Sequence, residues 1–175
     1  MRLRFPAFCF FIAGALLVAK GLALDFAARR LDVSGFAIGV AALGVWRMPR
    51  AATNWRGWIG RAVSALALLA VIPVMILLLS LVLPSPKEGG TPLLFRLPLS
   101  IGFILLIAAW FLRCWENSHA HRRWRLGLGL ALLWYPIFGL GAALGWGGGY
   151  WPAGLMWIAQ GCLLWPPRAV RPTDR

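Results

Sequence analysis

Residues 62–83, AVSALALLAVIPVMILLLSLVL, decide what kind of fold this chain adopts. The stretch carries no charge, and its only polar side chains are Ser64 and Ser80. At about 1.5 Å of rise per residue, a helix of this length covers roughly 33 Å, a little more than the hydrocarbon core of a bilayer. The stretch is therefore typical of a membrane-spanning helix, and the basic, Trp-bearing run at residues 47–61 would anchor it at one membrane face.

The composition of the whole chain agrees with a membrane protein. Of its 175 residues, 61% are hydrophobic and 13% are charged, whereas about a quarter of the residues in soluble domains are charged. The net charge of +13 is compatible with nucleic-acid binding. However, the basic residues lie in short segments between apolar runs, where membrane topology alone would put them. We therefore expect no nucleic-acid partner.

Further apolar segments accompany residues 62–83, so the sequence predicts an all-α, polytopic transmembrane helix bundle that forms a single membrane domain without a soluble domain. The six expected spans are residues 5–24, 33–46, 62–83, 97–112, 126–144 and 150–165. The first is interpreted as uncleaved, since no convincing small-x-small site follows its apolar core, and Lys20 is expected to extend toward the far headgroups. Residues 33–46 would form only about 21 Å of helix, so a five-span form without them is the second choice.

The distribution of basic residues favours six spans. Six crossings place both termini on one face, which then holds thirteen basic residues against five on the other. The first face carries Arg2, Arg4, Arg47, Arg50, Arg56, Arg61, Arg113, Arg122, Arg123, Arg125, Arg168, Arg171 and Arg175, and the second carries Lys20, Arg29, Arg30, Lys87 and Arg96. The positive-inside rule makes the first face cytoplasmic. The predicted location is thus the bacterial inner (cytoplasmic) membrane.

Arginine stands beside tryptophan in two connectors of the expected cytoplasmic face. These side chains are predicted to contact anionic lipid headgroups, at about 1 kcal/mol for each basic residue near the surface. They are Trp55, Arg56, Arg122, Arg123, Trp124 and Arg125. Tryptophans at expected span ends, Trp110 among them, would form an interfacial belt, whereas Trp134 and Trp157 lie inside spans.

Two small-xxx-small patterns predict where helices approach closely. Gly35 and Gly39 form one pattern, and Gly141 and Gly145 form the other. Small residues let helix backbones come together where no hydrophobic force drives association. We expect these glycines to support packing within the chain, with contact to a second copy or a partner as the alternative.

Candidate chemistry is confined to residues 113–125, RCWENSHAHRRWR. On a helix Glu116 and His119 would share a face, but a di-iron bundle needs that motif twice together with further glutamates. Cys114 and His121 lie nearby, and we interpret the segment as a solvated connector. The sequence therefore predicts no catalytic residue, no metal and no cofactor.

Two features inside expected spans remain. Trp134, Tyr135 and Pro136 would place an indole N–H and a hydroxyl beside a bend, because a proline inside a helix frees a carbonyl. Such a break is usually an ordinary kink, although in transporters it can frame a midplane site. Gln160 is strongly polar and is expected to hydrogen-bond a neighbouring helix.

These patterns favour a non-catalytic accessory or assembly component of a membrane complex. The alternatives are a small transporter or channel for an uncharged solute and a lipid-modifying membrane enzyme that uses residues 113–125. The expected partners are the lipid bilayer, with anionic headgroups on the cytoplasmic face, and a protein partner or a second copy of the chain.

Overall fold

A computed structural model of the chain describes residues 3–26, 33–49, 58–69, 93–119 and 121–166. The elements are α1 (Arg4–Phe26), α2 (Ser34–Arg47), the helix Trp58–Leu69, α4 (Leu93–Asn117), α5 (Arg122–Ala143), the 3-10 turn η1 (Gly147–Gly149) and α6 (Tyr150–Leu164). Within the described residues every element is helical, so the all-α prediction is confirmed for that part of the chain.

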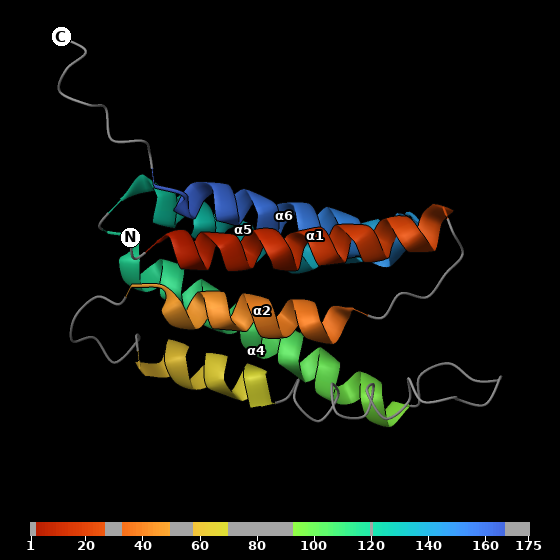
Figure 1. Ribbon diagram of the computed structural model, residues 1–175, viewed down its shortest axis with the longest axis horizontal. Helices are drawn as coiled ribbons and strands as arrows, with labels where there is room; N and C mark the ends of the chain where they lie inside the picture. The colour runs from red at the N-terminus through yellow and green to blue at the C-terminus, as the bar shows by residue number, and fades with distance from the viewer. Residues whose placement is uncertain (1–2, 27–32, 50–57, 70–92, 120, 167–175) are drawn as a thin grey trace, which may run out of the picture.

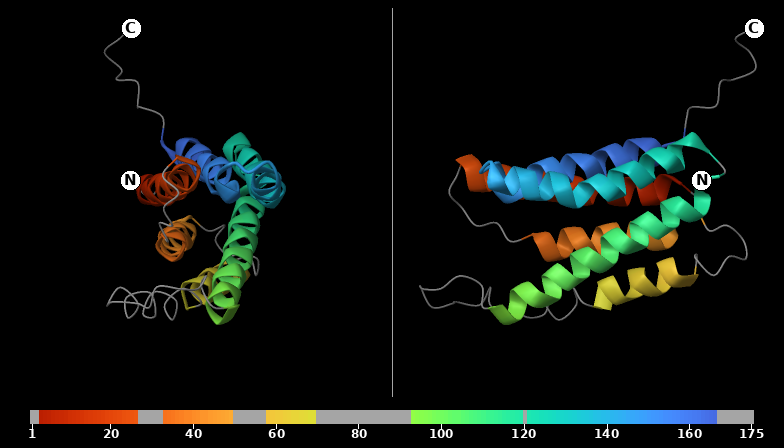
Figure 2. Two further views of the ribbon diagram at one scale, coloured as in Figure 1. Left: turned by 90° about the vertical axis from the view of Figure 1, so that its right-hand side faces the viewer. Right: turned by 180° about the vertical axis from the view of Figure 1, so that it is seen from behind.

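Five of the helices close into a ring. α1 packs against α6 and α2, α2 against α4, α4 against α5, and α5 against α6, and the α1–α6 contact is the most extensive. Successive helices run in alternating directions (Figure 1). Figure 2 shows α4 crossing the bundle at an angle, close to α5 at the connection between them and farther away toward Leu93.

Three helices are long and apolar enough to cross a membrane by length and composition: Arg4–Asp25, Ser100–Asn117 and Arg122–Ala143. Ser34–Arg47 and Trp58–Leu69 are shorter apolar helices. The described helices fall on the expected apolar segments, although residues 70–83 of the expected span 62–83 lie outside the described residues. The largest difference is α4, which continues to Asn117 instead of ending near residue 112.

The α1–α6 contact is built on small residues spaced seven apart. Ala7, Gly14 and Gly21 on α1 pair in antiparallel register with Gly161, Gly154 and Gly147, respectively. A Cβ on Gly14 would lie 2.6 Å from the Gly154 carbonyl oxygen, and a Cβ on Gly147 would lie 2.6 Å from Gly21 Cα. A seven-residue period keeps one stripe of a helix facing its partner when the helices cross at a small left-handed angle. We call these six residues the glycine seam.

An aromatic core fills the interior of the ring. Phe10 of α1 lies 5.5 Å from the Trp110 ring and 6.4 Å from the Trp157 ring, between ring centroids. The Phe103 ring stacks at 5.3 Å on Trp134 and at 6.2 Å on Trp157. Trp110, placed by its sequence position in an interfacial belt, is instead fully buried. It belongs to the core because α4 extends nearly two turns beyond it.

Two of the predicted packing glycines end α5. A Cβ on Gly141 would lie 3.0 Å from Gly149 Cα, so this glycine permits the close turn into α6. Gly145 has φ of +76°, and a Cβ there would have no neighbour within 4 Å. Its N–H donates to the Ala142 carbonyl and the next N–H, of Trp146, donates to the Gly141 carbonyl, which is the Schellman arrangement that favours glycine. Gly145 therefore terminates a helix and does not pack two together.

On α2, a glycine outside the predicted packing pair Gly35 and Gly39 lies in tight contact with α1. Gly35 is buried and Gly39 is half-buried. The glycine of α2 in tight contact with α1 is Gly44, where a Cβ would lie 2.9 Å from the Cys9 Cβ.

The two ends of the bundle differ in charge. One end, here called the basic end, collects the start of α1, the end of α2, the α4–α5 connection and the end of α6 (Figure 1). There the Arg47 guanidinium lies 5.9 Å from the Phe5 ring centroid, and Asn117 Nδ2 donates to the Pro49 carbonyl at 3.1 Å. At the opposite, glycine-turn end, the backbone N–H of Gly147 donates to Asp25 Oδ1 at 2.6 Å.

Candidate functional site

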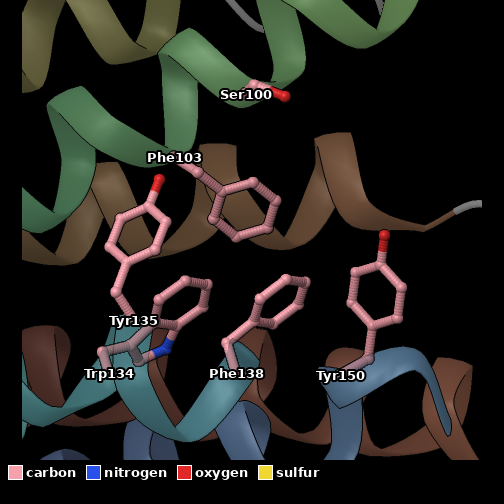
Figure 3. A pocket seen from close by; sticks show the side chains of 6 residues that line it. All are labelled: Ser100, Phe103, Trp134, Tyr135, Phe138 and Tyr150. Atoms are coloured by element: carbon pink, nitrogen blue, oxygen red, sulfur yellow. The ribbon is translucent and has the colours of Figure 1, made fainter. Parts of the chain in front are cut away.

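A partly open pocket lies between α4 and the α5–α6 hairpin, with a cavity volume of about 150 Å³. Six side chains line it: Ser100, Phe103, Trp134, Tyr135, Phe138 and Tyr150. Figure 3 shows Ser100 and Phe103 on one side and the rings of α5 and α6 on the other. The pocket lies where α4 diverges from α5 toward the start of α4 (Figure 2).

The pocket walls are aromatic faces. Trp134 and Phe138 stack at 5.3 Å with their planes 6° apart, and Phe103 stacks on Trp134 at 29°. Tyr150 closes the row edge-on to Phe138 at 5.4 Å. This arrangement offers flat, nearly parallel surfaces, the geometry on which another planar ring stacks well.

The polar groups of the pocket are hydroxyls. The Tyr135 and Tyr150 hydroxyls point in the same direction, toward α4, where Ser100 adds a third (Figure 3). No lining residue is an Asp, Glu, His, Lys or Arg. The chemistry available at the walls is therefore stacking and neutral hydrogen bonding. The Trp134-Tyr135-Pro136 run predicted this place in part, since two of its residues line the pocket and Pro136 lies inside α5.

Lys20 lies directly behind the pocket. Its Nζ is 4.2 Å from the centroid of the Tyr150 ring and donates a hydrogen bond to the Ser34 hydroxyl. Only 8% of Lys20 is exposed. The sequence predicts that this side chain extends toward headgroups, but it is buried and contacts Ser34 at the start of α2 and Tyr150 at the start of α6.

The basic end holds a buried ion pair. Arg113 Nη1 donates to Glu116 Oε2 at 2.8 Å, and both side chains are fully buried. Asn117 Nδ2 donates to the Arg113 carbonyl at 2.9 Å. A Cβ on Gly60, in the helix Trp58–Leu69, would lie 3.5 Å from Arg113 Cζ. The pair lets α4 continue through two charged residues, because each neutralises the other.

The other members of the 113–125 segment do not join that pair in one site. α4 ends at Asn117, His119 lies in the following turn and His121 precedes α5, so Glu116 and His119 do not share a helix face. Among the described residues no group of three or more His, Cys, Asp or Glu side chains could hold a metal ion. Cys114 is buried beside Gly127, where a Cβ would lie 3.0 Å from its Sγ.

Gln160 lies in the same part of the core and has no partner there. It is fully buried, and within the described chain neither Oε1 nor Nε2 makes a hydrogen bond. A Cβ on Gly127 would lie 2.7 Å from Gln160 Oε1. The expected hydrogen bond to a neighbouring helix is therefore not formed within the described residues.

The predicted headgroup contacts divide into three groups. Trp55 and Arg56 lie outside the described residues. Arg122 and Arg125 are exposed and Arg123 is half-buried at the basic end. Trp124 is only 2% exposed, because it is packed into the hydrophobic core and does not face the surrounding medium.

Comparison with protein-family models, with curated proteins and with solved structures found no match to this chain. The fold and the described side chains define an all-helical bundle with three helices long and apolar enough to span a membrane.

Proposed function

We propose that this chain is a multi-pass protein of the bacterial cytoplasmic membrane, with six spans and both termini on the cytoplasmic side. The alternating helix directions support this proposal, because they bring the basic residues flanking different helices to one end of the bundle (Figure 1). α2 lies alongside α1 and buries eight residues in the ring, including Ala37, Ala41 and Val45. Such packing supports six crossings over the five-span alternative.

Within that membrane we propose a non-catalytic role in the assembly or stabilisation of a larger complex. The observation that carries this proposal is the openness of α5. In the most apolar stretch of α5, 22% is buried inside the bundle, whereas 44% is buried in that of α1 and 50% in that of α4. Large apolar side chains cover its outer face: Leu126, Leu132, Leu133, Leu140 and Leu144. In a membrane such a face is satisfied by lipid or by a partner helix.

The interior supports a structural role as well. Arg113 and Glu116 form an ion pair inside the bundle. The glycine seam holds α1 close to α6. The lipid-modifying alternative would need Glu116 and His119 to act together, and the fold separates them onto a helix and a turn.

The test is cross-linking in native membranes followed by purification in mild detergent. We expect a protein partner or a second copy at a fixed ratio. Leu132→Trp, on the open face of α5, should abolish that recovery, whereas Leu155→Trp, on an exposed position of α6, should retain it. A wild-type chain recovered alone as a monomer would contradict the assembly role.

A second candidate is a carrier for an uncharged solute. The pocket favours it, because aromatic and hydroxyl groups line a cavity beside the helix that contains Pro136. Reconstituted liposomes should then show solute flux that Tyr135→Phe or Pro136→Ala changes. Absence of flux across a broad panel of neutral solutes would eliminate this candidate.

A further inference from the structure

We propose that the pocket between α4, α5 and α6 binds a neutral, hydroxylated aromatic ring of the phenol or quinol class. Such a ring comes from a free phenol or from the head of a lipid-soluble prenylated quinol. This binding site is independent of the proposed assembly role and of the solute carrier alternative. It is tested by measuring ligand binding at equilibrium, without any transport assay.

The size of the cavity selects a single ring. A volume of about 150 Å³ is close to that of an apolar protein cavity known to accept benzene. A fused or bulky ring system would extend out of this space through the opening. Since the pocket is partly open, a substituent such as a prenyl tail can leave it along the outside of the bundle.

The walls select an aromatic ring over a saturated one. Phe103, Trp134 and Phe138 present stacked faces, and the Tyr150 ring stands edge-on at one end (Figure 3). These rings already contact one another, so a ligand ring would lie beside them in the cavity, next to the Tyr150 ring. Offset and edge-to-face contacts add attraction that a cyclohexyl ring lacks.

The polar groups select a neutral hydroxyl. Ser100, Tyr135 and Tyr150 each contribute an O–H that can donate or accept a hydrogen bond. An anionic ligand would find no cation in the lining, and a cationic ligand would find no carboxylate there. Lys20 lies behind the Tyr150 ring, where its ammonium already donates to Ser34.

The test uses 4-fluorophenol and the full-length protein in detergent, observed by fluorine NMR. We expect saturable binding with a Kd on the order of 1 mM, as fits a ligand with so few non-hydrogen atoms. Cyclohexanol, which keeps the ring size and the hydroxyl, should compete about 2- to 10-fold more weakly than phenol. Equal competition by the two would overturn the proposal.

A matched pair of variants distinguishes ligand binding in the pocket from partitioning of the ligand into the detergent micelle. Ser100→Trp fills the pocket and should weaken binding at least about 10-fold, whereas Ile101→Trp places the same indole at an exposed neighbour that does not line the pocket. Unchanged binding in a folded Ser100→Trp protein, or a response that rises linearly with ligand in all proteins, would overturn the proposal. If Ser100→Trp does not fold, the wild-type comparison of phenol with cyclohexanol decides alone.

Native mass spectrometry of protein taken gently from its own membrane distinguishes the two sources of the ring. A retained prenylated quinol that phenol displaces identifies the lipid source. Phenol binding without such a mass identifies a free solute. A retained phospholipid that phenol cannot displace and that Ser100→Trp removes would overturn the proposal, because an acyl chain would then occupy the pocket. Loss of the assembly partner in Leu132→Trp is a separate readout, so the two proposals fail independently.

Discussion

Gly14 of α1 and Gly154 of α6 face each other so closely that a Cβ on either would lie 2.6 Å from the other's carbonyl oxygen. No real Cβ tolerates that distance, so one backbone must move if either residue changes. The relationship repeats one heptad away on each side, and it sets the separation of the two helices that share the most extensive contact in the bundle.

We therefore expect Gly14→Ala to lower the free energy of unfolding by about 1–3 kcal/mol, because overpacking forces a backbone shift. Gly129→Ala is the matched control, since a Cβ there has no neighbour within 4 Å. It should change stability by less than about 1 kcal/mol, in the stabilising direction, through helix propensity. Thermal unfolding in one detergent measures both. Equal effects of the two substitutions on the free energy of unfolding would show that close packing at the glycine seam does not determine stability.

From the Arg113–Glu116 ion pair we expect the effects of two substitutions on the free energy of unfolding to be non-additive. Arg113→Leu alone should destabilise the protein by about 3–5 kcal/mol, because it removes the guanidinium that donates to the buried Glu116 carboxylate at 2.8 Å. The double variant Arg113→Leu/Glu116→Leu should recover most of that loss, since both charges are then removed. Arg122→Ala, an exposed position at the same end, is the control. A double variant less stable than Arg113→Leu would show that the pair is not the reason for the loss.

Gln160 predicts a substitution that stabilises. Neither atom of its amide finds a partner in the described core, and an unsatisfied buried polar group costs about 1–3 kcal/mol. Gln160→Met keeps the length of the side chain and removes both polar atoms, so the unfolding temperature should rise. Cys162→Ala, at an exposed position on the same helix, should leave it unchanged. A fall in the unfolding temperature of Gln160→Met would show that the amide is hydrogen-bonded after all.

The sequence predicted the helical segments well because each is an apolar run bounded by a charged or a glycine-rich connector. It misplaced the end of α4 for the same reason: Arg113 and Glu116 look like a connector in one dimension, but at a spacing of three they pair on one helix face and the helix continues. Lys20 was misjudged likewise, since Ser34 and Tyr150, which surround it, lie far away along the chain.

The glycine seam carried a signal that a search for four-residue spacing does not detect. Gly14 and Gly21 are seven apart, and so are Gly147, Gly154 and Gly161. A search at heptad spacing would have paired α1 with α6 directly. The pocket was indicated only by Trp134 and Tyr135, because its volume depends on the angle at which α4 leaves α5, and no local pattern encodes that angle.

The proposed six-span arrangement places the basic end of the bundle at the cytoplasm and the glycine-turn end at the opposite side. It is tested by single cysteines in a background where Cys9, Cys114 and Cys162 are replaced, labelled in intact cells with a maleimide that cannot cross the membrane. Asp25→Cys and Trp146→Cys should react from outside. Arg47→Cys and His121→Cys should react only after the membrane is opened. Reaction of Asp25→Cys and Arg47→Cys from the same side would show that α2 does not cross, and the proposed six-span arrangement would be wrong.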